Sequence, residues 1–286
     1  MVDGVADGGA VAPLGPASRV AGALMEEDGA IFLDLELPEG ALLRWEPVAE
    51  PVPGAEHPNT YGAVWYAARG EAIARDGGAV IGWTPENGLG IPAVPVTANA
   101  GGGLSDGGGL RFEREVNAGL VAENALVDAR HFTVAVRFES PEHEARTLVT
   151  LNPGAHDNYL FLSEKEGTLI WEDEDATAGV RMPSRAGAQW VAASYALGAL
   201  SLSRADEGGD FEDVQSGPAS LSLAAAMAGA SDLFIGCRSH RKGIVKTLGA
   251  SVIHDILFWI DADCLATPEG RGMLTAACRH VEGADA

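Results

Sequence analysis

The sequence predicts an all-β protein in which two antiparallel sheets pack face to face as a sandwich. Between residues 107 and 260 the chain is a series of short alternating segments, most of them at spacings near ten residues. Short strands at this spacing, separated by turn residues, are typical of antiparallel sandwiches. A hydrophobic content of 47% and 37 glycines indicate a folded chain with many turns.

The first hundred residues predict an arm followed by strands. Residues 1–28 are rich in Ala, Gly and Pro without a sustained period, which is typical of a flexible or docking arm. Residues 32–37 alternate with three leucines on one face, so they predict a strand. After a proline-rich loop the strand pattern returns at residues 62–68 and 78–83.

A glycine-rich tract divides the chain. Six of the eleven residues in 99–109 are glycine, and such a tract is typical of a mobile connection or an exposed loop. We therefore expect an N-terminal β-rich extension over residues 29–106 and the sandwich over residues 107–286.

The second part of the chain predicts most of the sandwich strands and one helix. The strongest element is the hairpin at residues 189–203, where a strand led by Trp190, a tight Gly198 turn and a second alternating strand follow one another. The other expected strands are residues 110–112, 131–138, 147–151, 159–163, 168–171, 232–236 and 249–259. Thr267 as N-cap and Pro268 in the first turn predict a short C-terminal helix that ends near Cys278.

Charge and the N-terminal residues limit the function classes. The chain has 19 Lys and Arg against 41 Asp and Glu, a net charge of −22, which repels a phosphate backbone, so we expect no nucleic-acid partner. The N-terminus lacks the basic start and apolar core of a secretory signal, and no apolar run of about 18 residues predicts a membrane span. We expect a product made in the cytoplasm without a signal peptide. If it acts outside the cell, it is released or displayed as part of a particle.

Four landmarks in order resemble a known superfamily over residues 107–262. They are the Gly-Gly-Leu-Arg-Phe opening with the Phe-Thr-Val strand, the strand at Leu148, the Gln-Trp-Val-Ala hairpin, and Leu-Phe-Ile-Gly with the closing strand that ends at Trp259. The chain is similar to the laminin-G-like modules of the concanavalin A-like lectin and glucanase superfamily. The resemblance implies a jelly-roll sandwich. It also raises a disulfide between Cys237 and Cys264 as an alternative to the buried free thiols that we expect.

An acidic cluster is the first candidate for catalysis. Retaining glucanases of that superfamily carry three carboxylates at alternating positions of one strand, which places all three on one face. Here residues 172–175 supply Glu, Asp, Glu and Asp, but the two frames continue to Ala176 and Thr177. Neither frame has a third carboxylate, so we interpret the cluster as the solvated end of a hairpin.

Two loops are candidates for binding. The loop at residues 152–159 offers Asp157 and Asn158, whose side-chain oxygens suit calcium, and related modules hold calcium on a sandwich-edge loop. The same residue types are also what turns require. The second loop concentrates four basic residues in nine positions of an otherwise acidic chain, and forked guanidinium contacts there suit a carboxylate or sulfate of an acidic glycan. Its candidate side chains are Arg238, His240, Arg241 and Lys242.

Aromatic side chains complete the candidate set, because a flat exposed ring covers the apolar face of a sugar. Tyr159 and Trp171 are the candidates within the sandwich. Trp65, Tyr66 and Trp83 are further candidate platforms, whereas Trp190 and Trp259 are expected in the core.

Three functional hypotheses follow. The first is a noncatalytic module that recognises a polysaccharide or a cell-surface glycan. The second is a polysaccharide-degrading enzyme, either a glycosidase with a dispersed carboxylate pair or a lyase with Tyr159 or His156 as base. The third is a spike or fibre protein of a phage-like particle, for which a homo-oligomer is expected.

Overall fold

The structure is a computed structural model, and its described residues fall into two compact units, Met1–Glu56 and His57–Ala286. The described residues are 22–27, 30–35, 60–77, 79–96, 103–105, 108–114, 116–127, 131–154, 156–196, 198–240 and 249–284. In the first unit β1 (Gly22–Glu27) and β2 (Ala30–Leu35) form an antiparallel hairpin. The strand expected near residue 32 is confirmed. Residues 22–27, which fall within the expected arm, pair with β2, and docking by the arm stays a prediction.

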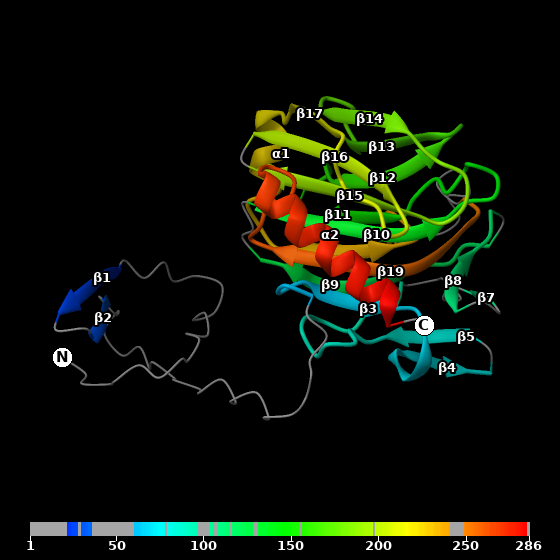
Figure 1. The fold of residues 1–286 in the computed structure, drawn as a ribbon, viewed down its shortest axis with the longest axis horizontal. Helices are drawn as coiled ribbons and strands as arrows, with labels where there is room; N and C mark the ends of the chain where they lie inside the picture. Colours follow the sequence, from blue (N-terminus) through cyan, green and yellow to red (C-terminus); the bar gives the residue numbers. More distant parts are fainter. Residues whose placement is uncertain are drawn as a thin grey trace. The chain divides into compact units, whose positions relative to one another are not determined.

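The second unit is a sandwich of two antiparallel sheets, as the sequence predicts (Figure 1). The eight-stranded sheet has the order β17-β16-β15-β10-β19-β8-β7, with β3 also paired to β19, and the seven-stranded sheet has the order β14-β13-β12-β11-β18-β9-β6. The strands of the first sheet are β3 (Val64–Ala67), β7 (Gly103–Ser105), β8 (Gly109–Phe112), β10 (His131–Glu139), β15 (Gln189–Ala196), β16 (Ala199–Asp206), β17 (Val214–Pro218) and β19 (Ser251–Ile260). Those of the second are β6 (Val94–Pro95), β9 (Leu120–Leu126), β11 (Val149–Asn152), β12 (Leu160–Lys165), β13 (Thr168–Asp173), β14 (Gly179–Pro183) and β18 (Ser231–Ile235).

The division expected near residue 106 is wrong. Strand β3 pairs with β19, β6 pairs with β9 and β7 pairs with β8, so residues assigned to an extension supply strands to both large sheets. The short hairpin of β4 (Ile73–Asp76) and β5 (Ala79–Trp83), preceded by the 3-10 helix η1 (Gly70–Ala72), belongs to the same unit. Trp83 is fully buried in the sandwich core, and its indole N–H donates to the carbonyl of Ala67.

Two apolar layers stabilise this unit. The larger lies between the sheets, where alternate residues such as Val191, Tyr195 and Phe258 are buried. The smaller covers the outer face of the eight-stranded sheet and includes Trp190 and Trp259, which are buried as expected but belong to the same cluster as Leu274 and Val281 of the C-terminal helix. Burial of alternating side chains on both faces is why β15 shows a continuous apolar run.

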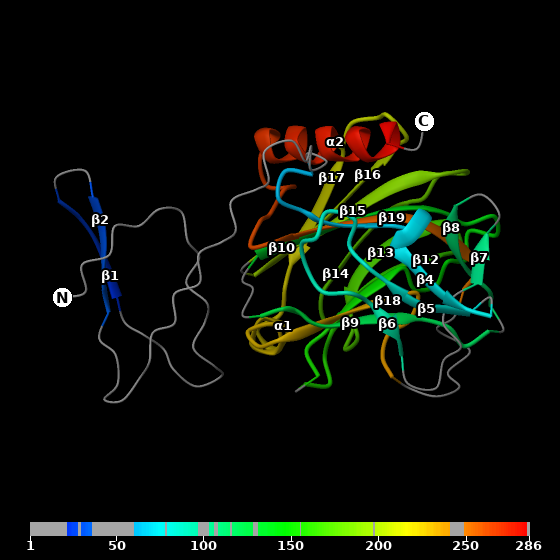
Figure 2. The same cartoon turned by 90° about the horizontal axis from the view of Figure 1, so that it is seen from below.

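The C-terminal helix α2 (Pro268–Gly283) begins where the sequence predicts, with the Thr267 hydroxyl accepting from the Gly270 N–H. It continues past the expected end at Cys278, because buried Val281 extends its apolar face and the Glu282 carboxylate accepts from the Trp190 indole at 2.7 Å. Figure 2 shows α2 on the outer side of the eight-stranded sheet. The short helix α1 (Leu221–Ala226) precedes β18.

The cysteines and the helices bear on the expected disulfide and on the expected absence of a membrane span. The three cysteines are buried free thiols, which confirms that expectation over the disulfide. In the part of the chain that the structure describes, no helix has the length and apolar character that a membrane crossing requires.

Candidate functional site

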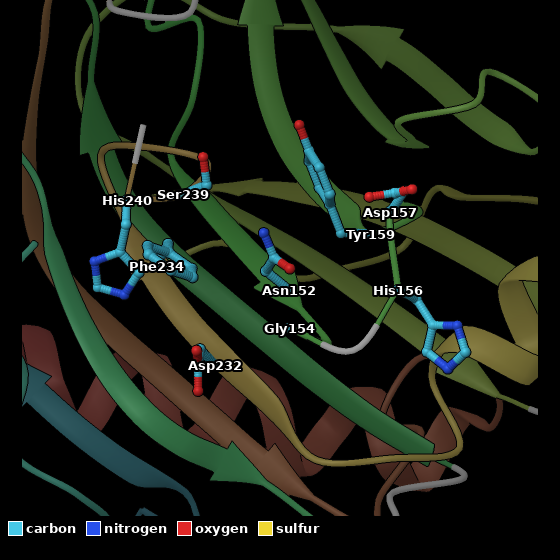
Figure 3. A pocket seen from close by; sticks show the side chains of 9 residues that line it. All are labelled: Asn152, Gly154, His156, Asp157, Tyr159, Asp232, Phe234, Ser239 and His240. Carbon is cyan, nitrogen blue, oxygen red and sulfur yellow. The ribbon is translucent and has the colours of Figure 1, made fainter. Parts of the chain in front are cut away.

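The outer face of the seven-stranded sheet carries an open pocket of about 360 Å³ where β11, β18 and the start of β12 meet (Figure 3). Strand alternation explains why polar groups gather here. Val149, Leu151, Leu233 and Ile235 point into the core between the sheets, so their neighbours on β11 and β18 face outward. The pocket is lined by Asn152, Gly154, His156, Asp157, Tyr159, Asp232, Phe234, Ser239 and His240.

Asn152 and Asp232 lie next to each other in the lining of the pocket. They are cross-strand partners on β11 and β18, which places their side chains side by side. The Asn152 amide donates to the carbonyl of Arg238 at 3.1 Å, and one Asp232 oxygen accepts from the Asn124 N–H at 2.7 Å. Asn124 has a left-handed backbone at an irregularity of β9, so Asp232 also holds that strand.

Phe234 and His240 form the apolar side. Phe234 is buried in a small cluster with Val96, Val121 and Cys237, separate from the main core. The exposed His240 ring lies edge-on to it, with centroids 5.1 Å apart. The pocket therefore combines the ring of Phe234 with side chains that donate hydrogen bonds and side chains that accept them.

Arg238 fixes the loop that carries Ser239 and His240. Its guanidinium lies over the Phe161 ring at 3.5 Å, donates to the Thr147 hydroxyl at 3.3 Å and pairs with the Glu174 carboxylate at 3.1 Å. Stacking and an ion pair together fix a guanidinium plane more firmly than either alone. These contacts engage Arg238 with protein groups beside the pocket.

Tyr159 lines the pocket and its phenol lies next to Glu174 and Arg238. Burial raises the pKa of its phenol to about 12, and the nearby Glu174 carboxylate acts in the same direction. A phenol with so high a pKa stays protonated at neutral pH, so Tyr159 suits the role of hydrogen-bond donor and is a poor general base.

Asp173 supports the loop from below. One of its oxygens accepts from the Thr177 and Ala178 N–H groups, and the other accepts from the Thr177 hydroxyl and the Asn158 amide, all within 2.6 to 2.9 Å. Burial alone would raise the pKa of Asp173, but these hydrogen bonds outweigh it and hold the pKa below its ordinary value. The expectation of a solvated acidic cluster is wrong for Asp173, which is 1% exposed because its carboxylate organises the turn.

The two candidate calcium ligands differ in their surroundings. Asn158 is buried, and besides its bond to Asp173 it accepts from the Asp175 N–H at 3.3 Å, whereas Asp157 is exposed at the pocket. Among the described residues no group of three or more His, Cys, Asp or Glu side chains is placed to hold a metal ion. Calcium bound by Asp157 and Asn158 stays a prediction.

The aromatic side chains expected as exposed platforms are buried. Trp171 is fully buried in the main core, where its indole N–H donates to the carbonyl of Ser194, so the expectation of an exposed ring is wrong. Trp65, Tyr66 and Trp83 are buried as well, because they face the sandwich core or the layer under α2. Tyr159 lines the pocket, but it is only 5% exposed, so it is not an open platform either.

The structure thus brings together predicted residues from two loops about 80 positions apart, namely Asp157, Tyr159, Arg238 and His240. Arg241 and Lys242 lie outside the described residues. Sequence reasoning did not select Asn152, Asp232, Phe234 or Ser239. For Asn152, Asp232 and Phe234 the signal was the outward position in strands β11 and β18, which becomes informative only when the pairing of those strands is known, whereas Ser239 lies in the loop after β18.

Comparison with known proteins gives a likeness of fold. The chain matches no protein family model and no curated protein. A mutant of Trypanosoma rangeli sialidase displaying trans-sialidase activity is 15% identical, with 80% of this chain and 34% of that chain covered and a TM-score of 0.49. A GH54 a-l-arabinofuranosidase soaked with a cyclic sulfate inhibitor is 9% identical, with 71% of this chain and 51% of that chain covered and a TM-score of 0.46. Domains LG4-5 of the mouse laminin alpha1 chain are 14% identical, with 57% of this chain and 44% of that chain covered and a TM-score of 0.41.

The chain spans between about a third and a half of the length of these three solved chains. Laminin G domains are among the similar structures. At these identities the likeness concerns the fold alone.

Proposed function

We propose that the chain is a noncatalytic glycan-recognition module and that the pocket beside Tyr159 and His240 is its binding site. The observation that carries the proposal is the composition of the pocket: an amide, carboxylates, a hydroxyl and imidazoles line it next to the buried rings of Phe234 and Tyr159. Sugars present hydroxyl groups next to apolar ring faces, and sites that bind small polar ligands combine apolar walls with a few placed polar groups.

The contacts around the pocket support binding over catalysis. Tyr159 is held protonated, which disfavours it as the base of a lyase. The acidic cluster provides no free acid and base pair, because Glu172 pairs with Arg181, Glu174 pairs with Arg238, and Asp173 is used by the turn. Each of these carboxylates therefore has a structural partner.

Glycoside hydrolysis is the second candidate. The observation that favours it is that two carboxylates, Asp157 and Asp232, line the same pocket, and most glycosidases use a pair of carboxyl groups at the scissile bond. Of the two, Asp232 accepts a backbone hydrogen bond that supports β9, and Asp157 is the exposed carboxylate.

A glycan array followed by a turnover assay tests the proposal. We expect saturable binding without release of reducing ends or unsaturated sugars, and binding should be repeated with a chelator to test the calcium prediction. His240→Ala should weaken binding about tenfold, the loss of roughly one good contact. His131→Ala, at the start of β10 in the other sheet, is the matched control and should bind like the unmodified chain.

The possible results separate the candidates. Absence of saturable binding to every sugar on the array would refute the proposed function. Turnover that Asp157→Asn abolishes would replace it with hydrolysis. Equal loss in both histidine variants would remove this pocket from consideration.

A further inference from the structure

We infer that the pocket selects an uncharged saccharide and discriminates against its anionic counterpart, an inference that rests on the proposed function. The basic loop, taken as sequence alone, favours an acidic glycan. The described contacts favour the opposite class.

The first argument is the charge of the lining. Asp157 and Asp232 contribute two carboxylates to the lining of the pocket. A sugar hydroxyl donates to a carboxylate in a charge-assisted hydrogen bond, whereas a uronate or sulfate at the same position is repelled. The same two side chains therefore favour one ligand class and disfavour the other.

The second argument is that the adjacent cation is already paired. Arg238 holds the Glu174 carboxylate at 3.1 Å and the Thr147 hydroxyl at 3.3 Å, with its plane against the Phe161 ring. An anionic sugar that recruited this guanidinium would separate it from Glu174 and leave that carboxylate without its partner. Arg238 is accordingly a positioning residue for Ser239 and His240.

The third argument is the long-range field. The chain carries a net charge of −22, so a polyanionic glycan is repelled during approach as well as in the pocket. Salt screens the long-range part at distances beyond about 10 Å at 0.1 M, but it acts less on a contact inside the pocket. The two contributions can therefore be separated by experiment.

The test compares matched oligosaccharides on the full chain by calorimetry. The probes are gluco-, galacto- and manno-oligosaccharides of equal length, each in neutral form and as the uronate, at about pH 8, where a carboxylic acid is ionised. We expect the best neutral probe to bind at least about fivefold more tightly than its uronate, the ratio that one carboxylate at contact distance produces in water.

Two variants locate the source of the preference. Asp157→Asn should reduce the neutral-to-uronate ratio about fivefold, because it removes the local repulsion from an exposed side chain. Glu212→Gln makes the same change in net charge at an exposed site next to Phe211, which is buried in the layer under α2, and should leave the ratio unchanged.

A uronate that binds the unmodified chain as tightly as its neutral form, or more tightly, would overturn the inference while the proposed function stands. A ratio that both variants reduce equally would also overturn it, because the preference would then come from net charge. If neither form of any probe binds, both the inference and the proposed function fail.

Discussion

Asp173→Asn tests the account of how the pocket loop is held. The substitution keeps the shape of the side chain but replaces the oxygen that accepts from the Asn158 amide and the Thr177 hydroxyl with an NH₂ group. The Thr177 hydroxyl can rotate and accept instead, so the net change is one lost charge-assisted hydrogen bond, one weakened bond and one buried donor left facing another. With hydrogen bonds to charged groups at about 1.5 to 3 kcal/mol, the expected loss of unfolding free energy is about 3 kcal/mol.

In a unit of this size that loss corresponds to a fall of about 6 to 12 °C in melting temperature. Thermal unfolding followed by circular dichroism measures it. The control is Asp175→Asn, an exposed carboxylate two residues away, which should change the unfolding free energy by less than about 0.5 kcal/mol.

The difference between the unmodified chain and Asp173→Asn should also depend on pH in one direction. Hydrogen bonds hold the pKa of Asp173 below its value of 3.8 in the unfolded chain, so the folded state binds fewer protons. The stabilisation is therefore complete above about pH 5 and is lost as the pH falls through the folded-state pKa. Equal melting temperatures for the two variants at neutral pH, or a gap that widens toward acid, would refute this account of the turn.

Two further predictions concern the packing of the sandwich. Gly236→Ala should lower the free energy of unfolding by about 3 to 4 kcal/mol, because Gly236 has a left-handed backbone and an added Cβ would overlap the Phe112 ring. Gly198 also has a left-handed backbone but faces open space, so Gly198→Ala should lower it by about 1 kcal/mol in chemical denaturation. Equal losses would contradict the overlap. The native thiols should react slowly with an aromatic disulfide reagent at pH 8 and rapidly after unfolding, since burial raises the pKa of Cys237 to about 12 and that of Cys264 to about 11; fast labelling of the folded chain would contradict their burial.

Local patterns account for the elements that sequence reasoning predicted. The β15–β16 hairpin follows from the alternation in β16 and a turn at Gly198, which has a left-handed backbone, and the helix start at Thr267 follows from its cap. The direction in which Trp190 faces was not predictable, because both faces of β15 are apolar and alternation then gives no inside or outside. Strand β9 was missed because exposed polar residues and the left-handed Asn124 interrupt its pattern.

The residues of the candidate site could be predicted only in part from local sequence patterns. Its two loops meet because β11 pairs with β18, strands about 80 residues apart, and no local pattern encodes that pairing. The sequence therefore selected several of the residues while giving Arg238 a role as ligand contact that its pairing with Glu174 does not support. The glycan, the calcium ion, the homo-oligomer and the particle attachment stay predictions.

The location of the pocket follows from how the two outer faces are covered. Helix α2 buries the outer face of the eight-stranded sheet, where Trp190 and Leu257 contact it through the second apolar layer. The outer face of the seven-stranded sheet carries the small cluster around Phe234, and at the strand ends Asn152 and Asp232 are half-buried. A sheet buries one face by packing on its partner, so we propose the binding site on the opposite, outer face of the seven-stranded sheet. Because that face carries carboxylates and an engaged guanidinium, its charge and its exposure lead to the same expectation, an open site for an uncharged polar ligand.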